Sequence, residues 1–139
     1  MKLSLTTIVV PEYDAAIDYY VNALGFHLLE DTQLNNGKRW VVVSPSLDCS
    51  HGLLLARAAS DEQRSRIGNQ TGGRVAFFLE TDDFHATHSR LQKQGVEFTE
   101  SPRNESYGTV AVFKDAFGNR WDLIEPQTNR AKDDSSEIH

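Results

Sequence analysis

Histidine is the most versatile chemical group in this chain of 139 residues, which contains five of them. His85 and His88 lie three residues apart, a spacing that places both on one side of a helix. We expect this pair to belong to a solvated helix face that caps and packs. His27 and His51 each fall in an expected strand. A strand histidine that faces a cleft serves as an acid, a base or a hydrogen-bond partner, and otherwise it is structural.

The stretch 115–126 combines charged and apolar side chains, and it reads as a tight turn followed by a last strand. Because side chains alternate along a strand, Trp121 and Leu123 face one way. Arg120 and Asp122 then face the other way. Asp122 is therefore predicted to be either a paired structural charge or part of a site.

Composition excludes several functional classes. The chain has 39% apolar and 24% charged residues, as expected for a soluble globular protein of one domain, and its net charge of -6 gives no support to binding of nucleic acid or of an anionic membrane. Cys49 is the only cysteine, so an intrachain disulfide and a multi-cysteine zinc site are both excluded. No apolar run approaches the roughly 20 residues that span a bilayer, and no signal-peptide pattern is present. We expect a cytoplasmic location.

Strand and helix patterns occur twice in the same order. The first half predicts strands at 3–10, 26–34, 38–44 and 51–57 and helices at 12–24 and 60–67. The second half predicts strands at 74–80, 96–100, 107–114 and 120–126, a helix from 81 to 95, and a polar loop at 102–106. The start of the first helix and its glycine cap are 13 residues apart in each half, Glu12 to Gly25 and Asp82 to Gly95. The chain is a β-α-β-β-β unit written twice.

Four segments of this doubled unit carry a resemblance to a known superfamily. They are Tyr19-Tyr20, Ala23-Leu24-Gly25-Phe26, Thr81-Asp82-Asp83-Phe84 and the ending Asp115…Gly118-Asn119…Asp122-Leu123. The chain resembles the vicinal oxygen chelate superfamily: glyoxalase I, extradiol dioxygenases, and fosfomycin and bleomycin resistance proteins. The resemblance covers residues 1–126 and implies one α+β domain. Two βαβββ modules, 1–68 and 73–126, would form a curved mixed-sheet cup with helices on the outer faces, and 127–139 would be a polar tail.

The resemblance also implies where metal ligands lie in the enzymes, one on each of four strands. These positions fall on Leu5; on Leu53, Leu54 or Leu55; on Arg74, Val75 or Ala76; and on Asp122. A divalent metal needs several imidazole or carboxylate groups that converge on one ion. Only Asp122 carries such a group, so we expect a protein without a metal cofactor.

Alternation along the strands predicts which side chains line the cup. Val110 and Val112 suit the helix side, which leaves Tyr107, Thr109, Ala111 and Phe113 for the cup. The candidate ligand-binding residues are Leu5, Arg74, Phe78, Glu80, Tyr107, Arg120 and Asp122. An aromatic and aliphatic pocket with a few charges suits an organic molecule. We expect Asp122 to pair with Arg74, with Arg120 or with the positive end of a bound molecule.

Three functions remain open for such a chain. The first is a metal-independent, homodimeric protein that binds a small organic ligand in the cup, as bleomycin resistance proteins do. The second is a metal-dependent lyase, isomerase or dioxygenase with ligands at unusual positions such as His27, His51 and Asp122. The third is an interaction module whose cup is filled by charges that pair with one another. The fold itself does not decide among them, because it hosts unrelated activities.

Overall fold

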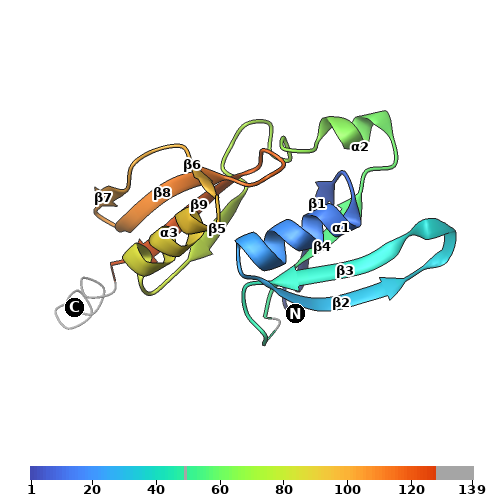
Figure 1. Ribbon diagram of the computed structural model, residues 1–139, viewed down its shortest axis with the longest axis horizontal. Coiled ribbons are helices and arrows are strands. Elements are labelled where there is room, and N and C mark those ends of the chain that lie inside the picture. The colour runs from blue at the N-terminus through green and yellow to red at the C-terminus, as the bar shows by residue number, and fades with distance from the viewer. Residues whose placement is uncertain (49, 128–139) are drawn as a thin grey trace. The chain divides into compact units, whose positions relative to one another are not determined.

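The computed structural model describes residues 1–48 and 50–127, and its fold is α+β (Figure 1). The chain divides into two compact units: residues 1–73 with the turn 116–119, and residues 74–115 with the chain from 120 onward. Each unit has one sheet of mixed strands, so the predicted fold class with its repeated order of elements is confirmed. Cys49 and most of the predicted tail, 128–139, lie outside the described residues. None of the helices described is long and apolar enough to cross a membrane.

The first unit is built on a four-stranded sheet in the order β1-β4-β3-β2, in which β1 and β4 are parallel and the other neighbours antiparallel. Its strands are β1 (Leu5–Val10), β2 (His27–Gln33), β3 (Arg39–Ser44) and β4 (Gly52–Arg57). Its helical segments are α1 (Tyr13–Ile17), the π-helical turn η1 (Asp18–Ala23), the 3-10 turn η2 (Asn35–Gly37) and α2 (Asp61–Ser65). The β-branched residues of β1 and β3 suit strands that pack on one face.

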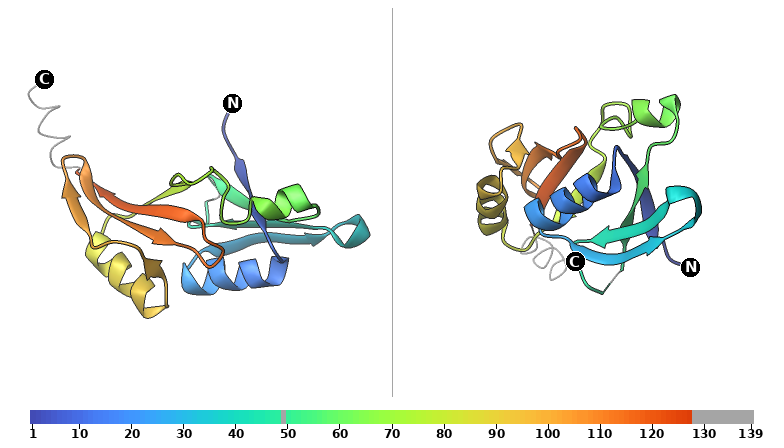
Figure 2. Two further views of the ribbon diagram at one scale, coloured as in Figure 1. Left: turned by 90° about the horizontal axis from the view of Figure 1, so that it is seen from above. Right: turned by 45° about the vertical axis from the view of Figure 1, so that its right-hand side comes forward.

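α1 and η1 cover one face of this sheet (Figure 2). They pack on it through an apolar stripe. The buried members of the stripe are Tyr13, Ala16, Tyr20 and Leu24. The predicted helix 12–24 is not regular, because the amide of Leu24 donates to the carbonyl of Tyr19, a wider turn than that of an α-helix. The rings of Tyr19 and Tyr20 both lie 6.1 Å from the ring of Phe117. The turn 116–119 thus belongs to the core of the first unit.

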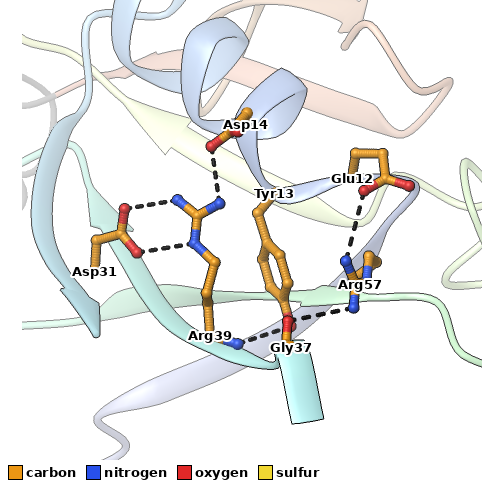
Figure 3. Close-up of polar contacts among 7 residues, drawn as sticks. All are labelled: Glu12, Tyr13, Asp14, Asp31, Gly37, Arg39 and Arg57. Atoms are coloured by element: carbon orange, nitrogen blue, oxygen red, sulfur yellow. Dashed lines mark hydrogen bonds and ion pairs between the residues drawn. The ribbon is translucent and has the colours of Figure 1, made fainter. Parts of the chain in front are cut away.

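An ion-pair cluster holds the start of α1 against the ends of β3 and β4 (Figure 3). The ring of Tyr13 lies between the guanidinium groups of Arg39 and Arg57, whose carbon atoms are 5.2 and 5.1 Å from the ring centroid. Arg39 donates two hydrogen bonds to Asp31, at 3.1 and 2.7 Å, and one to Asp14 at 2.8 Å. Because a bidentate pair has a defined geometry, the cluster fixes the helix relative to the β2–β3 hairpin.

The second unit has strands in the order β5-β9-β8-β6, with β7 also paired to β8. Its elements are β5 (Phe77–Glu80), α3 (Phe84–Lys93), β6 (Glu97–Phe98), β7 (Arg103–Glu105), β8 (Gly108–Lys114) and β9 (Arg120–Pro126). The prediction of a loop at 102–106 is wrong, because Arg103–Glu105 pairs with the start of β8. In this hairpin the backbone N–H and C=O groups of the polar segment form hydrogen bonds with β8, whereas in a loop they would need other partners. α3 begins as expected, since the Asp83 side chain accepts a hydrogen bond from the amide of Ala86.

α3 lies against one face of the second sheet (Figure 2), and the contact is made by aromatic rings. Trp121 pairs in the sheet with Phe77 on β5 and with Phe113 on β8, and the ring centroids are 4.7 and 5.8 Å apart. Phe98 continues the cluster at 5.4 Å from Phe113, and it contacts His88 of α3. This face is therefore the hydrophobic core of the unit.

The register of β8 on β9 corrects one prediction about the other face. Phe113 pairs with Trp121 and Ala111 with Leu123, so these two residues of β8 face α3 instead of a cup. Val110, Val112 and Lys114 face away from α3. The reason is the turn 115–119, which pairs Lys114 directly with Arg120 and so decides the face of every residue of β8. Tyr107 lies outside both strands, in the turn between β7 and β8.

His88 supplies a test of the α3 packing. Its Nε2 atom is buried with no hydrogen-bond partner among the described residues, and its ring stacks on Phe84 at 5.4 Å. Burial lowers the pKa of His88, and the nearby His85 lowers it further. Because the unfolded chain binds the proton more readily, the free energy of unfolding should fall as the pH drops below about 6.5. Chemical denaturation between pH 7 and pH 5 measures this slope.

The His88→Leu variant should show a smaller loss of stability over this pH range, since an apolar side chain fills the site without a titrating group. His85→Gln is the control, because His85 is exposed on the same helix. Equal slopes for wild type and His88→Leu would contradict the assignment.

Candidate functional site

The face of the second sheet that points away from α3 collects most of the predicted site residues. Phe78 pairs with Asp122 and Glu80 with Ile124 across β5 and β9, so these side chains share one face. The members of this face, called the charged face from here on, are Phe78, Glu80, Val110, Val112, Lys114, Arg120, Asp122 and Ile124. Three adjacent strands, β5, β9 and β8, therefore position the candidate site.

Asp122 lies in the middle of the charged face and is only 9% exposed. Its Oδ1 atom has no hydrogen-bond partner within the described residues. None of the ion pairs seen among the described residues includes Asp122, and its pairing with Arg74 or Arg120 stays a prediction. Burial raises the pKa of Asp122; Arg103 lowers it and Glu100 raises it further. Asp122 is thus a desolvated carboxyl group with one oxygen that has no partner among the described residues.

A hollow of about 340 Å³ lies on this unit beside Asp122. It is lined by Val75, Thr99, Glu100, Val112, Lys114 and Arg120. Val112 is the partner of Asp122 across β8 and β9, so the hollow and the carboxyl group are neighbours on one face. Apolar walls with a few charged groups are typical of sites for small organic molecules.

The charged side chains that line the hollow differ in whether another side chain already binds them. Glu100 accepts hydrogen bonds from Arg103 at 3.0 Å and from the amide of Val112 at 2.9 Å. The hydrogen bond from Arg103 is the main cause that lowers the pKa of Glu100. Lys114 and Arg120 lie directly opposite each other on β8 and β9. The hollow therefore has a neutralised carboxylate and two cationic groups.

The remaining predicted site residues do not line the hollow. Phe78 is 69% exposed on the charged face and is free to contact a ligand. Tyr107 is exposed in its turn, and Arg74 precedes β5 without lining the hollow. Leu5 belongs to the first unit, where it pairs with Gly52 on the face opposite α1. The structure thus brings together Phe78, Glu80, Arg120 and Asp122, and it adds Lys114, Glu100 and Thr99.

Known proteins share this fold over nearly its whole length. The sequence of this chain matches the family model of the Glyoxalase/Bleomycin resistance protein/Dioxygenase superfamily over residues 2–123. The chain belongs to this superfamily. The resemblance inferred from the sequence is therefore confirmed. An uncharacterised protein of Shewanella frigidimarina (strain NCIMB 400) is 54% identical over 128 residues, which cover 90% of this chain and 95% of that protein.

Two solved structures match this chain in three dimensions. UcmS2 is 29% identical with a TM-score of 0.78, and the match covers 89% of this chain and 97% of that chain. TnmS3, described as an antibiotic-binding protein from Streptomyces sp. CB03234, is 31% identical with a TM-score of 0.74, and the match covers 91% and 97% of the two chains. Both matches extend over the two units of the chain.

The residues at the superfamily's metal-ligand positions do not fit a metal ion. Leu54 pairs with Thr7 and so shares the face of Leu5, which selects it among the three leucines of β4. In the second unit, Ala76 lies two residues before Phe78, on the side of Asp122. Leucine and alanine have no atom that coordinates a metal. Among the described residues, no group of three or more His, Cys, Asp or Glu side chains could hold an ion.

The histidines proposed for an unusual metal site have other surroundings. His51 precedes β4 and uses both ring nitrogens: Nδ1 lies 3.1 Å from the carbonyl of Leu3, and Nε2 lies 2.8 Å from the hydroxyl of Thr6. Because a carbonyl only accepts, Nδ1 carries the proton and Nε2 accepts from Thr6. His27 is exposed at the start of β2, opposite Ser44 on β3. His51 is thus a structural link between β1 and the loop before β4.

A second hollow, of about 480 Å³, lies in the first unit around the ion-pair cluster of Figure 3. Its lining includes Tyr13, Arg39 and Arg57. Arg39 already binds Asp14 and Asp31, and the two faces of the Tyr13 ring are occupied by guanidinium groups. The cluster satisfies its own charges, so the charged face of the second unit is the better candidate site.

Proposed function

We propose that the protein is a metal-independent member of its superfamily that binds a small organic molecule on the charged face of the second sheet. The observation that carries this proposal is the 340 Å³ hollow, in which the aliphatic side chains of Val75 and Val112 meet two cationic groups on the face that also carries Asp122. An aromatic ring, Phe78, is exposed on the same face. The described similarity to TnmS3, an antibiotic-binding protein, supports a ligand of organic character.

Aromatic contact should provide part of the affinity, so Phe78→Ala should weaken binding. A lost ring contact corresponds to about 1 kcal/mol, or roughly a fivefold higher Kd. Calorimetric titration with a panel of aromatic compounds of different charge measures the change. Leu34→Ala is the control, because Leu34 is 47% exposed in the β2–β3 hairpin of the first unit. If no compound of the panel binds or raises the melting temperature, the protein is an interaction module and the proposal fails.

Metal independence has its own measurement. Leu5, Leu54 and Ala76 stand where the superfamily's enzymes bring ligands, and Asp122 alone cannot hold a divalent ion tightly. Elemental analysis of protein purified without chelator should find no stoichiometric transition metal. Added Zn²⁺, Mn²⁺ or Ni²⁺ should leave the melting temperature unchanged, since an ion that binds only the folded state must raise it. A tightly held metal would favour the lyase, isomerase or dioxygenase alternative.

We also propose that the protein is a cytoplasmic homodimer, as the superfamily resemblance implies. Sedimentation equilibrium at several protein concentrations should give a mass twice that of one chain. A single-chain mass at all concentrations would contradict it.

A further inference from the structure

We propose that the ligand of the charged face is an organic acid whose anionic group binds between Lys114 and Arg120. This inference rests on the proposed function and specifies the chemical class of its ligand. It starts from two cations that the fold places opposite each other, on neighbouring strands, at the rim of one hollow.

Lys114 has no carboxylate within the 4.0 Å of an ion pair in the part of the chain that the structure describes. Its side chain is half-buried, so solvent only partly screens its charge. Glu97 is its neighbour on β6, yet this exposed carboxylate does not line the hollow. Glu100, the carboxylate that does, is already bound by Arg103. The ammonium group of Lys114 is therefore available to a ligand.

The position of Arg120 strengthens this assignment. Arg120 lies directly opposite Lys114 and lines the same hollow, so an anionic group at this rim meets two positive side chains. A carboxylate accepts charge-assisted hydrogen bonds from ammonium and guanidinium groups. A cationic ligand would meet like charges at the same rim.

The rest of the charged face defines the body of the ligand. Val75 and Val112 form the apolar wall of the hollow, and Asp122 lies two residues along β9 from Arg120. Two residues of a strand span about 7 Å, which is the distance across a ring system that carries one acidic group. Phe78, beside Asp122, offers an aromatic surface at the far end. An aromatic acid suits this arrangement.

Three probes with one ring system test the charge preference: 2-naphthoate, 2-naphthamide and 2-naphthylmethylamine. Calorimetric titration of the full chain should give a Kd for the acid at least about tenfold lower than for the amide, the range expected of a charge-assisted pair. Lys114→Met should remove most of this preference, and Lys114→Arg should retain it. Lys93→Met is the matched control, because Lys93 lies in the last turn of α3 and is exposed. Circular dichroism verifies that each variant is folded.

The outcomes separate this inference from the proposed function. If the wild type binds the amide or the amine as tightly as the acid, or more tightly, the anion preference is overturned. The proposed site is still supported in that case if Phe78→Ala weakens the binding of these probes. An acid preference that persists in Lys114→Met overturns the role of Lys114. If none of the three probes and no compound of the wider panel binds, both proposals fail.

Discussion

Replacing Gly68 with alanine is expected to lower the free energy of unfolding by about 3 kcal/mol, the sum of a left-handed backbone penalty and a steric overlap. Gly68 has a φ of +73°, where a side chain is unfavourable, and an added Cβ atom would overlap the carbonyl oxygen of Phe117. That carbonyl belongs to the turn 116–119, which packs in the first unit. The predicted decrease in melting temperature is roughly 10 °C.

Gly72→Ala is a matched control for this variant. Gly72 also has a φ of +73°, but nothing lies within 4 Å of an added Cβ atom. It should therefore show only the backbone penalty, about 1 kcal/mol. The difference between the two variants, measured by chemical denaturation, isolates the close approach of the turn to Gly68. Equal losses would mean that this approach is absent in solution.

Replacing Asp122 with asparagine is expected to stabilise the protein at pH 7 by about 1 to 3 kcal/mol, because a charged group costs more to desolvate than a neutral polar group of the same shape. The wild-type carboxylate is desolvated, and asparagine keeps its shape without the charge. Because the pKa of Asp122 is raised in the folded state, its ionisation costs stability at every pH above its unfolded pKa. The gain should decrease as the pH falls and should disappear below about pH 4.

Urea denaturation of both proteins from pH 7 to pH 3.5 measures this effect. Asp82→Asn provides the control, since Asp82 is exposed before α3 and its substitution should change stability by only a few tenths of a kcal/mol. A destabilised Asp122→Asn variant at pH 7 would mean that the carboxylate has a favourable partner. In that case the residue is a structural charge and no ligand group is needed to explain it.

The sequence by itself determined the repeated architecture and the superfamily. Alternation and glycine caps are local properties, so the strands β1 to β5, the helix α3 and the final β9 follow from patterns over a few residues. The same alternation grouped Phe78, Glu80, Arg120 and Asp122 on one face, as the register of β5 on β9 does. The superfamily resemblance also placed Leu5 and the leucines of β4 at expected metal-ligand positions, while the third position stayed open among Arg74, Val75 and Ala76.

Only the tertiary structure decided how these local patterns combine. The face of β8 depends on its register with β9, and a shift of one residue exchanges the two faces, so Lys114 was missed and Ala111 and Phe113 were assigned to the wrong side. The same holds for the surroundings of Asp122: Arg103 lies far from it in the sequence, yet Arg103 lowers its pKa and also binds Glu100 of the hollow. Alternation states which side chains share a strand face, whereas pairing between strands and burial decide which charges meet.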